Sequence, residues 1–409
     1  MPSSKNPYDA VVIGAGIAGS AIVKALKNNE ISNFLVIDKG LGPATQTSAH
    51  GEALCHPYIG RGASRLQRLT FIAFKEAKAV WATNWCGSGV FHLPRTQDGF
   101  DKNIMSERLL TQGFNSEMAK PLTASEAKEK IGIAAGGTFF PEGGWVNLQQ
   151  ACKDVFEELL PEQKSWATEV KSIQQSKDGW QIYGTDNQLI ATSKRLFLAG
   201  GLGVKNLAKT AGIELPLKPV RGQLSRFRFN KDSSWDEAKP KVALSGKAYC
   251  LPPQKIADDQ YEWVVGSTYD EEVDDLSVWP DSHEENRALI KEMLNHELVD
   301  SELKAVGAFV GIRCVASDRL PIMGPVLNQP GLYILTSLGS RGVMWSALAS
   351  QMFTEHLAEE LNHSAFFDAR FFAGARLAAA GLTADLAGAL LAARFLAGAS
   401  NSKPIFPSA

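Results

Sequence analysis

The sequence predicts an α/β protein in which a Rossmann-like domain, a parallel sheet covered by helices, is interleaved with a domain built on an antiparallel sheet. Three observations lead to this prediction. At the N-terminus an apolar β-branched strand, a glycine-rich turn and an amphipathic helix follow one another between Tyr8 and Leu26, as in a dinucleotide-binding unit. A second strand–glycine–helix junction lies far along the chain, between Leu332 and Leu361. The length of 409 residues suits two domains.

The first of these elements carries the strongest motif. Residues Gly14–Gly19 read G-x-G-x-x-G, in which Gly14 allows a tight turn, Gly16 lets the backbone approach a pyrophosphate and Gly19 packs helix on strand. The helix N-terminus then presents N–H groups to the phosphates. Asp38 follows a second apolar strand, Phe34–Ile37, and is placed to accept a hydrogen bond from a ribose hydroxyl. A dinucleotide site is therefore expected here.

The next helix is predicted over residues 64–85 and carries a basic face. Its apolar positions repeat at helical spacing, and cations gather on another side: Arg61, Arg65, Arg68 and Lys75. Such a cluster could hold phosphates. A solvated surface face is the alternative interpretation.

Later elements divide the chain into domains. Apolar strands at Arg195–Gly201 and Leu332–Leu335 are expected to return to the nucleotide-binding sheet. Arg221-Gly222-Gln223 is expected to form a turn between strand-like stretches, a helix is expected over Ser282–Leu298, and residues 365–398 suggest docked terminal helices. The nucleotide-binding domain is expected over residues 1–85, 143–218 and 308–398, the substrate domain over 86–142 and 219–307, and a tail over 399–409.

Composition and cysteine spacing argue against several classes of protein. The formal net charge of −2 gives no global basic field, so a polyanion would need a local patch. The five cysteines are scattered without C-x-x-C spacing, which argues against a disulfide framework and a zinc site. We expect no bound metal. We see neither a secretory signal nor an apolar run that would span a membrane, and expect a cytoplasmic protein.

Five motifs together resemble the D-amino-acid-oxidase superfamily of FAD oxidoreductases, in order and spacing, over almost the whole chain. They are Gly14-x-Gly16-x-x-Gly19, Gly143-Gly-Trp145, Arg221-Gly-Gln223, Gly311-x-Arg313 with Asp318 and Pro321, and Gly339-x-Arg341-Gly342. Within the superfamily, the phrases around Arg313 and Arg341 and the late Ala393–Leu396 are similar to the FAD-dependent oxidoreductase domain of the bifunctional enzymes that make 5-methylaminomethyl-2-thiouridine in tRNA. The methyltransferase domain of those enzymes is absent from this sequence, so only the oxidative half is expected.

The resemblance implies an activity and residue roles. The expected reaction is FAD-dependent oxidation of the carboxymethylaminomethyl group on the tRNA wobble uridine, which releases glyoxylate and leaves aminomethyl-uridine. Arg313 is the expected holder of the substrate carboxylate, with a structural ion pair as the alternative, and Arg341 is expected near the flavin pyrimidine. Arg221 is expected to connect the domains near the flavin. The tRNA is expected to contact Arg61, Arg65 and Arg68, and a separate methyltransferase is a further expected partner.

The resemblance also implies a set of cofactor-binding residues, drawn from both glycine junctions and from the strands beside them. The set is Gly14, Ala15, Gly16, Ile17, Ala18, Gly19, Asp38, Lys39, Ser48, Val170, Gly200, Gly339, Ser340, Arg341, Gly342 and Val343.

One departure keeps alternatives open. The loop after the second strand reads Ser48-Ala49-His50-Gly51-Glu52, where the family usually has serine-glycine-asparagine and a further glycine. A non-catalytic nucleotide-binding protein is therefore one alternative. Another is an oxidase or dehydrogenase of free N-substituted glycines or amino acids. Reduction of the flavin by modified tRNA or by small amino acids would distinguish them.

Overall fold

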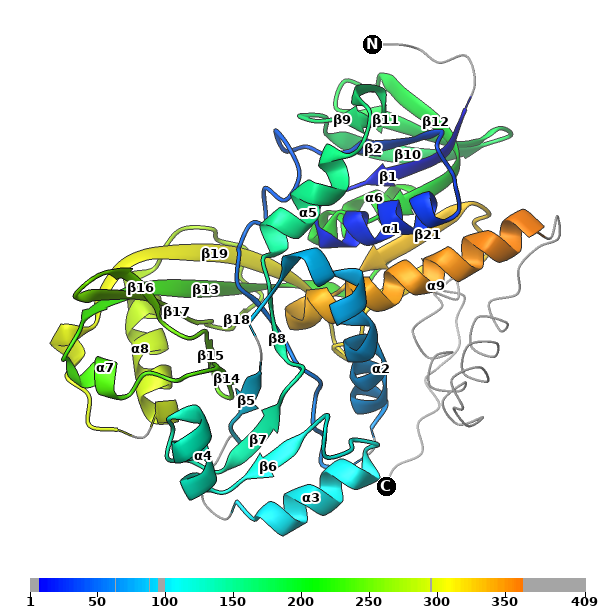
Figure 1. Cartoon of the computed structure of the whole chain (residues 1–409). Helices are drawn as coiled ribbons and strands as arrows, with labels where there is room; N and C mark the ends of the chain where they lie inside the picture. The colour runs from blue at the N-terminus through cyan, green and yellow to red at the C-terminus, as the bar shows by residue number, and fades with distance from the viewer. Residues whose placement is uncertain (1–6, 63, 88, 95–99, 295, 363–409) are drawn as a thin grey trace.

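The computed structural model describes residues 7–362 except 63, 88, 95–99 and 295. The stretch 365–398, expected to form terminal helices, lies outside the described residues. Figure 1 shows two sheet regions with helices packed around them, joined by two long strands that run side by side. No helix in the described part of the chain is both long and apolar enough to cross a membrane.

The first sheet contains the N-terminal strand at its centre. Strand β1 (Tyr8–Ile13) pairs in parallel with β2 (Phe34–Ile37) and β12 (Leu189–Leu198), with Val12 opposite Val36 on one side and Phe197 on the other. Residues 10–13 of β1, all of β2 and the last three residues of β12 are buried apolar runs, as parallel strands covered on both faces are. The sheet is completed by β9 (Lys164–Ser165), β10 (Val170–Ser176), β11 (Gly179–Gly184), β20 (Ile322–Pro325) and β21 (Leu332–Thr336).

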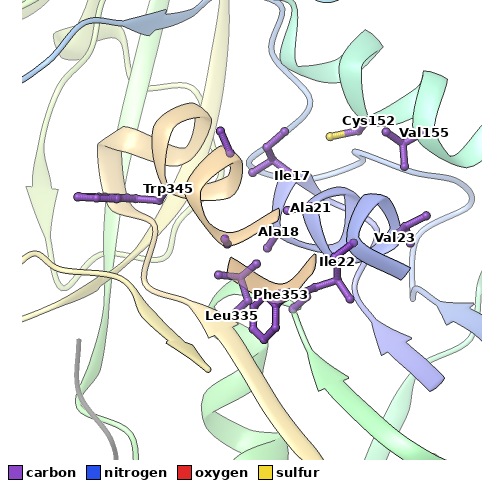
Figure 2. Packing of buried hydrophobic residues seen from close by; sticks show 14 of the residues in the cluster. Ile17, Ala18, Ala21, Ile22, Val23, Cys152, Val155, Leu335, Trp345 and Phe353 are labelled. Carbon is purple, nitrogen blue, oxygen red and sulfur yellow. The ribbon is translucent and has the colours of Figure 1, made fainter. Parts of the chain in front are cut away.

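Helices pack on this sheet around α1 (Ile17–Asn28). Small residues on α1, Ala18 and Ala21 among them, allow α9 (Gly342–Asn362) to approach closely, and Phe353 of α9 lies beside Leu335 in the same apolar cluster (Figure 2). The remaining helices of this part are α2 (Arg65–Val80), α5 (Leu148–Glu157) and α6 (Val204–Thr210).

The second sheet is largely antiparallel. Its longest strands, β13 (Leu217–Asn230) and β19 (Lys304–Ala316), pair along almost their whole length. The other strands are β5 (Val90–His92), β6 (Lys120–Leu122), β7 (Gly137–Phe140), β14 (Ala243–Ser245), β15 (Tyr249–Cys250), β16 (Gln254–Ala257), β17 (Gln260–Gly266) and β18 (Asp270–Glu271). Its helices are α3 (Lys102–Thr111), α4 (Ala124–Ile131), α7 (Ser234–Glu237) and α8 (Pro280–Leu294).

A small sheet lies between these parts of the chain. It pairs β8 (Gly144–Val146) with β3 (Ala53–Cys55) and β4 (Trp85–Cys86). Short 3-10 turns complete the chain at Ala82–Asn84, Pro161–Gln163, Gly201–Gly203, Asp300–Glu302 and Gly339–Arg341.

Three sequence predictions are wrong in detail. Arg221-Gly222-Gln223 is no turn but part of the continuous strand β13, because this strand has a ladder partner on each side there. Helix α2 begins at Arg65, so Arg61 precedes it, and a 3-10 turn replaces its expected last residues. Helix α8 begins at Pro280, a residue that suits the first turn of a helix, and ends at Leu294.

The expected domain boundaries at 218/219 and 307/308 fall inside β13 and β19. Both strands continue toward the first sheet, where the register brings Leu217 opposite Ala316. The two parts are therefore joined by paired strands, not by linkers, which fixes the residues of β13 and β19 relative to the glycine loop. We therefore propose that one domain is built on the first sheet and the other on the second sheet.

Candidate cofactor and substrate site

The first glycine junction requires glycine for steric reasons. Gly14 has a φ of +113° and donates its N–H to Ile37 O at 2.8 Å, and a Cβ there would lie 2.6 Å from Ala199 O. A Cβ on Gly19 would overlap with Gly14 O, so α1 can approach β1 only because position 19 has no side chain. Gly200 lies against Gly14 on the other side.

Asp38 joins two loops above the sheet. Its Oδ2 accepts the N–H of Ala15 at 2.7 Å, and its Oδ1 accepts the N–H of Gly40 at 2.7 Å. Each carboxylate oxygen keeps a second lone pair, so the predicted bond to a ribose hydroxyl stays compatible with these contacts. Lys39 beside it is exposed. Val170 follows a loop in which Thr168 donates its N–H to Asp38 O at 2.9 Å.

Ser48 lies at the N-terminus of α1. Its hydroxyl accepts the N–H of Ile17 at 3.1 Å and would lie 3.0 Å from a Cβ on Gly16. The first turn of α1 carries no acidic residue. A glycine without side-chain bulk, helix N–H groups and a hydroxyl therefore form a cradle that fits a pyrophosphate.

The second glycine junction meets the first. Gly339 has a φ of +53° in the short turn between β21 and α9, and a Cβ on Gly342 would lie 3.6 Å from Ile17 Cγ2. Ser340 is exposed and Val343 is buried, with its carbonyl accepting from Trp81 Nε1 at 3.2 Å. Two stretches more than 300 residues apart thus lie together, as the prediction of one shared cofactor requires.

Arg313 projects from β19 and makes no ion pair within the described part of the chain. Its guanidinium donates only to neutral oxygens, to Arg221 O at 3.3 Å, to Thr268 O at 3.4 Å and to the Ser267 hydroxyl. Burial lowers the pKa of Arg313. A half-buried cation without a carboxylate partner is costly unless a ligand supplies one.

Two glycines make room for this guanidinium. Gly222 of β13 and Gly311 of β19 are cross-strand partners, so both lack side chains on the same face of the sheet. A Cβ on Gly222 would overlap with both terminal nitrogens of Arg313, and one on Gly311 would meet the Phe309 ring at 3.0 Å. Thr47 reaches over Gly311 and donates to Ile312 O at 2.6 Å. The loop after β2 therefore covers a trough in the second sheet.

Arg221 differs from Arg313 in its environment. It is fully buried, pairs with Asp270 at 2.9 Å and lies over the Trp279 ring at 3.8 Å. Further bonds to Gln223, Asp275 and Ser277 leave its guanidinium fully used. This is a structural role, in line with its expected place as a connecting residue.

Arg341 lies over the Tyr58 ring at 5.4 Å. Burial lowers the pKa of Arg341, the Tyr58 hydroxyl acts in the opposite sense, and nearby Arg319 lowers that pKa further. The side chain of Arg341 therefore adds positive charge near Tyr58 and Tyr269 without a carboxylate partner in the described residues, which suits an anionic or electron-rich ligand.

Sequence reasoning missed His50. Its ring lies 5.2 Å from the Phe309 ring, and its Nδ1 has no hydrogen-bond partner among the described residues. Burial, with Arg313 and Arg226 nearby, lowers the pKa of His50 to about 4, so the imidazole is neutral at neutral pH. The departure of the Ser48–Glu52 loop from the family pattern was the available sign.

The three arginines that were predicted to contact phosphates do not all lie on one helix. Arg65 begins α2 and Arg68 lies one turn on, while Arg61 stands in the preceding loop. Arg61 and Arg65 are exposed, and the Nε of half-buried Arg68 has no partner in the described chain. The loop is held to the helix because Tyr58 N–H donates to Thr70 Oγ1 at 3.3 Å. All three cations are available to an anion.

Comparisons with known proteins show the family of this chain. Residues 9–356 match the family model described as FAD dependent oxidoreductase. The chain is similar to the tRNA 5-methylaminomethyl-2-thiouridine biosynthesis bifunctional protein MnmC of Cupriavidus necator, at 27% identity over 88% of this chain, and of Thiobacillus denitrificans, at 29% over 85%. It spans only 59% and 56% of those relatives.

Solved structures share the fold. Glycine oxidase from Geobacillus kaustophilus superposes with a TM-score of 0.70 at 19% identity, covering 90% of this chain and 98% of that one. Iminodiacetate oxidase from Chelativorans sp. BNC1 gives 0.70 at 16% identity, covering 86% and 95%. These similarities confirm the predicted mixed α/β architecture.

Proposed function

Because this chain belongs to the FAD-dependent oxidoreductase family, we propose that its substrate is an N-carboxymethyl amine, and that this amine is the carboxymethylaminomethyl group of a tRNA wobble uridine. FAD, when bound, supplies the acceptor for two electrons from the CH₂ between amine and carboxylate. The resulting imine reacts with water, which yields glyoxylate and aminomethyl-uridine.

The observation that carries the substrate class is the unpaired guanidinium of Arg313. A planar guanidinium binds the two oxygens of a carboxylate at once. Its half-buried position strengthens that attraction relative to water. His50 stays neutral beside it, so the imidazole adds no charge next to the guanidinium.

The residues of both glycine junctions would hold FAD. Gly14–Gly19 and Ser48 would bind the pyrophosphate, Asp38 the ribose, and the backbone at Gly339–Val343, with Arg341, the flavin ring. Donors fixed by a folded backbone need no reorganisation to stabilise negative charge on the ring. These assignments rest on the cradle geometry and on family membership.

The tRNA part of the proposal rests on two supports. The curated relatives bear names of a tRNA-modifying enzyme, and Arg61, Arg65 and Arg68 are free to contact phosphates. A methyltransferase acting on the aminomethyl product is the proposed partner, since this chain spans only part of those bifunctional relatives.

The test is anaerobic mixing of the FAD-loaded protein with tRNA carrying carboxymethylaminomethyl-uridine, in parallel with sarcosine, glycine and proline. We expect loss of flavin absorbance with the tRNA, and mass spectrometry of the nucleosides should show aminomethyl-uridine. Reduction by the small amines with none by tRNA would contradict the proposal.

A second candidate is oxidation of free N-substituted glycines. The observation in its favour is an acidic segment, 270–275, directly after Tyr269, whose ring lies 5.6 Å from the Arg313 guanidinium. Such a segment opposes a polyanion more than a small carboxylate. The same mixing experiment decides between the two substrates.

A further inference from the structure

Exposed aromatic rings occur at two places in the described residues, Tyr58 and Tyr269, with 36% and 41% of their surface accessible. The rings come from different parts of the fold, one from the loop before α2 and the other from the segment before β18. Exposed aromatic side chains are costly in water. Their joint position near the candidate substrate site therefore calls for an explanation.

Each ring lies next to arginine side chains. Arg341 is 5.4 Å from the Tyr58 ring, while Arg313 and Arg319 are 5.6 and 5.9 Å from the Tyr269 ring. Arg341 lies close to both groups, because Tyr58, Tyr269 and Arg319 all act electrostatically on the pKa of its guanidinium. We call Tyr58, Tyr269 and Arg319 the tyrosine–arginine rim.

The positive charge of the rim comes from Arg319. Arg319 is exposed, its backbone has a φ of +59°, and it forms no ion pair among the described residues. Among the described residues, the carboxylate that acts on the pKa of Arg313 is Asp270, which is already paired with Arg221. Flat rings beside cations suit a ligand that is both aromatic and anionic. A small aliphatic amino acid offers no ring to stack on two tyrosines.

We propose that the tyrosine–arginine rim binds an unpaired RNA loop, with nucleobases stacked on Tyr58 and Tyr269 and a phosphate held by Arg319. Single-stranded nucleic acids are recognised by stacking of splayed bases on aromatic rings and by contacts of cations with the backbone. This inference rests on the proposed function. It goes further by naming the residues through which the protein would distinguish an open loop from a duplex.

The test uses the FAD-loaded full chain and two fluorescent RNAs. One is an unmodified stem–loop with an anticodon-loop sequence, and the other is a blunt duplex of the same length. The variants are Tyr58→Leu, Tyr269→Leu, Tyr58→Phe and Arg319→Gln. Lys177→Gln, an exposed cation in the β10–β11 turn, is the matched control. FAD content and melting temperature show that each variant is folded.

We expect each leucine variant to weaken binding of the stem–loop about tenfold and to leave the duplex unchanged, since stacking on an aromatic ring accounts for about that factor. Tyr58→Phe should retain binding because it keeps the ring. Arg319→Gln should weaken both RNAs and flatten their salt dependence, while Lys177→Gln should match the wild type.

Two results would overturn the inference, and they differ in what they say of the proposed function. If the wild type binds the stem–loop and the leucine variants bind it equally well, the rim is not the RNA site, and a tRNA substrate stands. If the wild type binds neither RNA but is reduced by sarcosine, both the rim and the tRNA substrate are wrong.

Discussion

Gly222 of β13 lies directly beneath the guanidinium of Arg313 on the neighbouring strand. The two strands pair so that Val220 faces Arg313 and Gly222 faces Gly311, and any Cβ at position 222 would overlap with both terminal nitrogens of Arg313. The absence of one side chain therefore sets the position of the Arg313 guanidinium, a group that can bind a carboxylate bidentately.

Gly222→Ala should displace the Arg313 guanidinium and raise KM for a carboxylate substrate about tenfold or more, at a stability cost of about 1–3 kcal/mol. The measurement is anaerobic flavin reduction over a range of substrate concentrations, with FAD content determined in parallel. Gly307→Ala on β19 is the control, because its Cβ would meet its nearest atoms at 3.8 Å. An unchanged KM in Gly222→Ala would show that the position of the Arg313 guanidinium does not affect substrate binding.

Arg313→Gln should raise KM for the carboxylate substrate about 30- to 100-fold, because a charged hydrogen bond to a buried anion is worth about 2–3 kcal/mol. Arg313→Lys should restore only part of the affinity that Arg313→Gln loses, since an ammonium lacks the planar fork of a guanidinium. Arg228→Gln is the control on the same sheet, an exposed arginine paired with Glu262 at 3.0 Å. Equal KM values for Arg313→Gln and Arg228→Gln would refute the assigned role.

Asp38→Asn should weaken FAD binding about tenfold, since the amide can accept from only one of the two N–H groups that the carboxylate holds. It should also lower the stability of the FAD-free protein by about 1–2 kcal/mol, because the bridge from Ala15 to Gly40 is internal to the chain. Fluorescence titration of FAD and urea unfolding measure the two effects. Asp9→Asn, which breaks a surface pair with Lys194, should change neither.

Acidification should destabilise the fold through three partly buried histidines. Burial lowers the pKa of His50 and His92 to about 4 and that of His56 to about 3, whereas the unfolded chain titrates near 6.5. Between about pH 6.5 and 4 the unfolded state binds more protons, so the free energy of unfolding falls as pH falls, by up to roughly 3 kcal/mol per histidine.

Urea unfolding near pH 7 and near pH 4.5 measures this difference. His92→Asn should reduce the dependence on pH, and His296→Asn, at an exposed position, should leave it as it is. A wild-type protein equally stable at both values would show that these histidines are protonated in the fold.

Arg65→Glu combined with Arg68→Glu should weaken tRNA binding and lower the slope of log affinity against log salt by about one for each phosphate that the variant no longer neutralises. Anisotropy titrations at several salt concentrations measure it. Lys177→Glu, a reversal of charge at an exposed turn, is the control. If the affinity and its salt dependence are the same as in the wild type, α2 is not part of the RNA-binding surface.

The sequence by itself determined the glycine junctions and the strands around them. Gly14, Gly19 and Asp38 were predictable because their roles are local: a tight turn, a close helix and an acid at the end of the next strand. The covering helices followed from their apolar periodicity. Arg313 was found through its motif, which shows a residue type and a spacing but not what surrounds it.

Only the tertiary structure decided what those residues face. Arg313 and Arg221 are both arginines within two residues of a glycine in the sequence, and just one of them pairs with a carboxylate in the fold. Gly222 was predicted to lie in a turn. Instead, the pairing of β13 with β19 places it in a strand, directly against the guanidinium of Arg313. Tyr58 and Tyr269 are more than 200 residues apart, and no local pattern relates them. Strand pairing and burial act between distant segments, so neither charge balance nor exposure can be read from local sequence spacing.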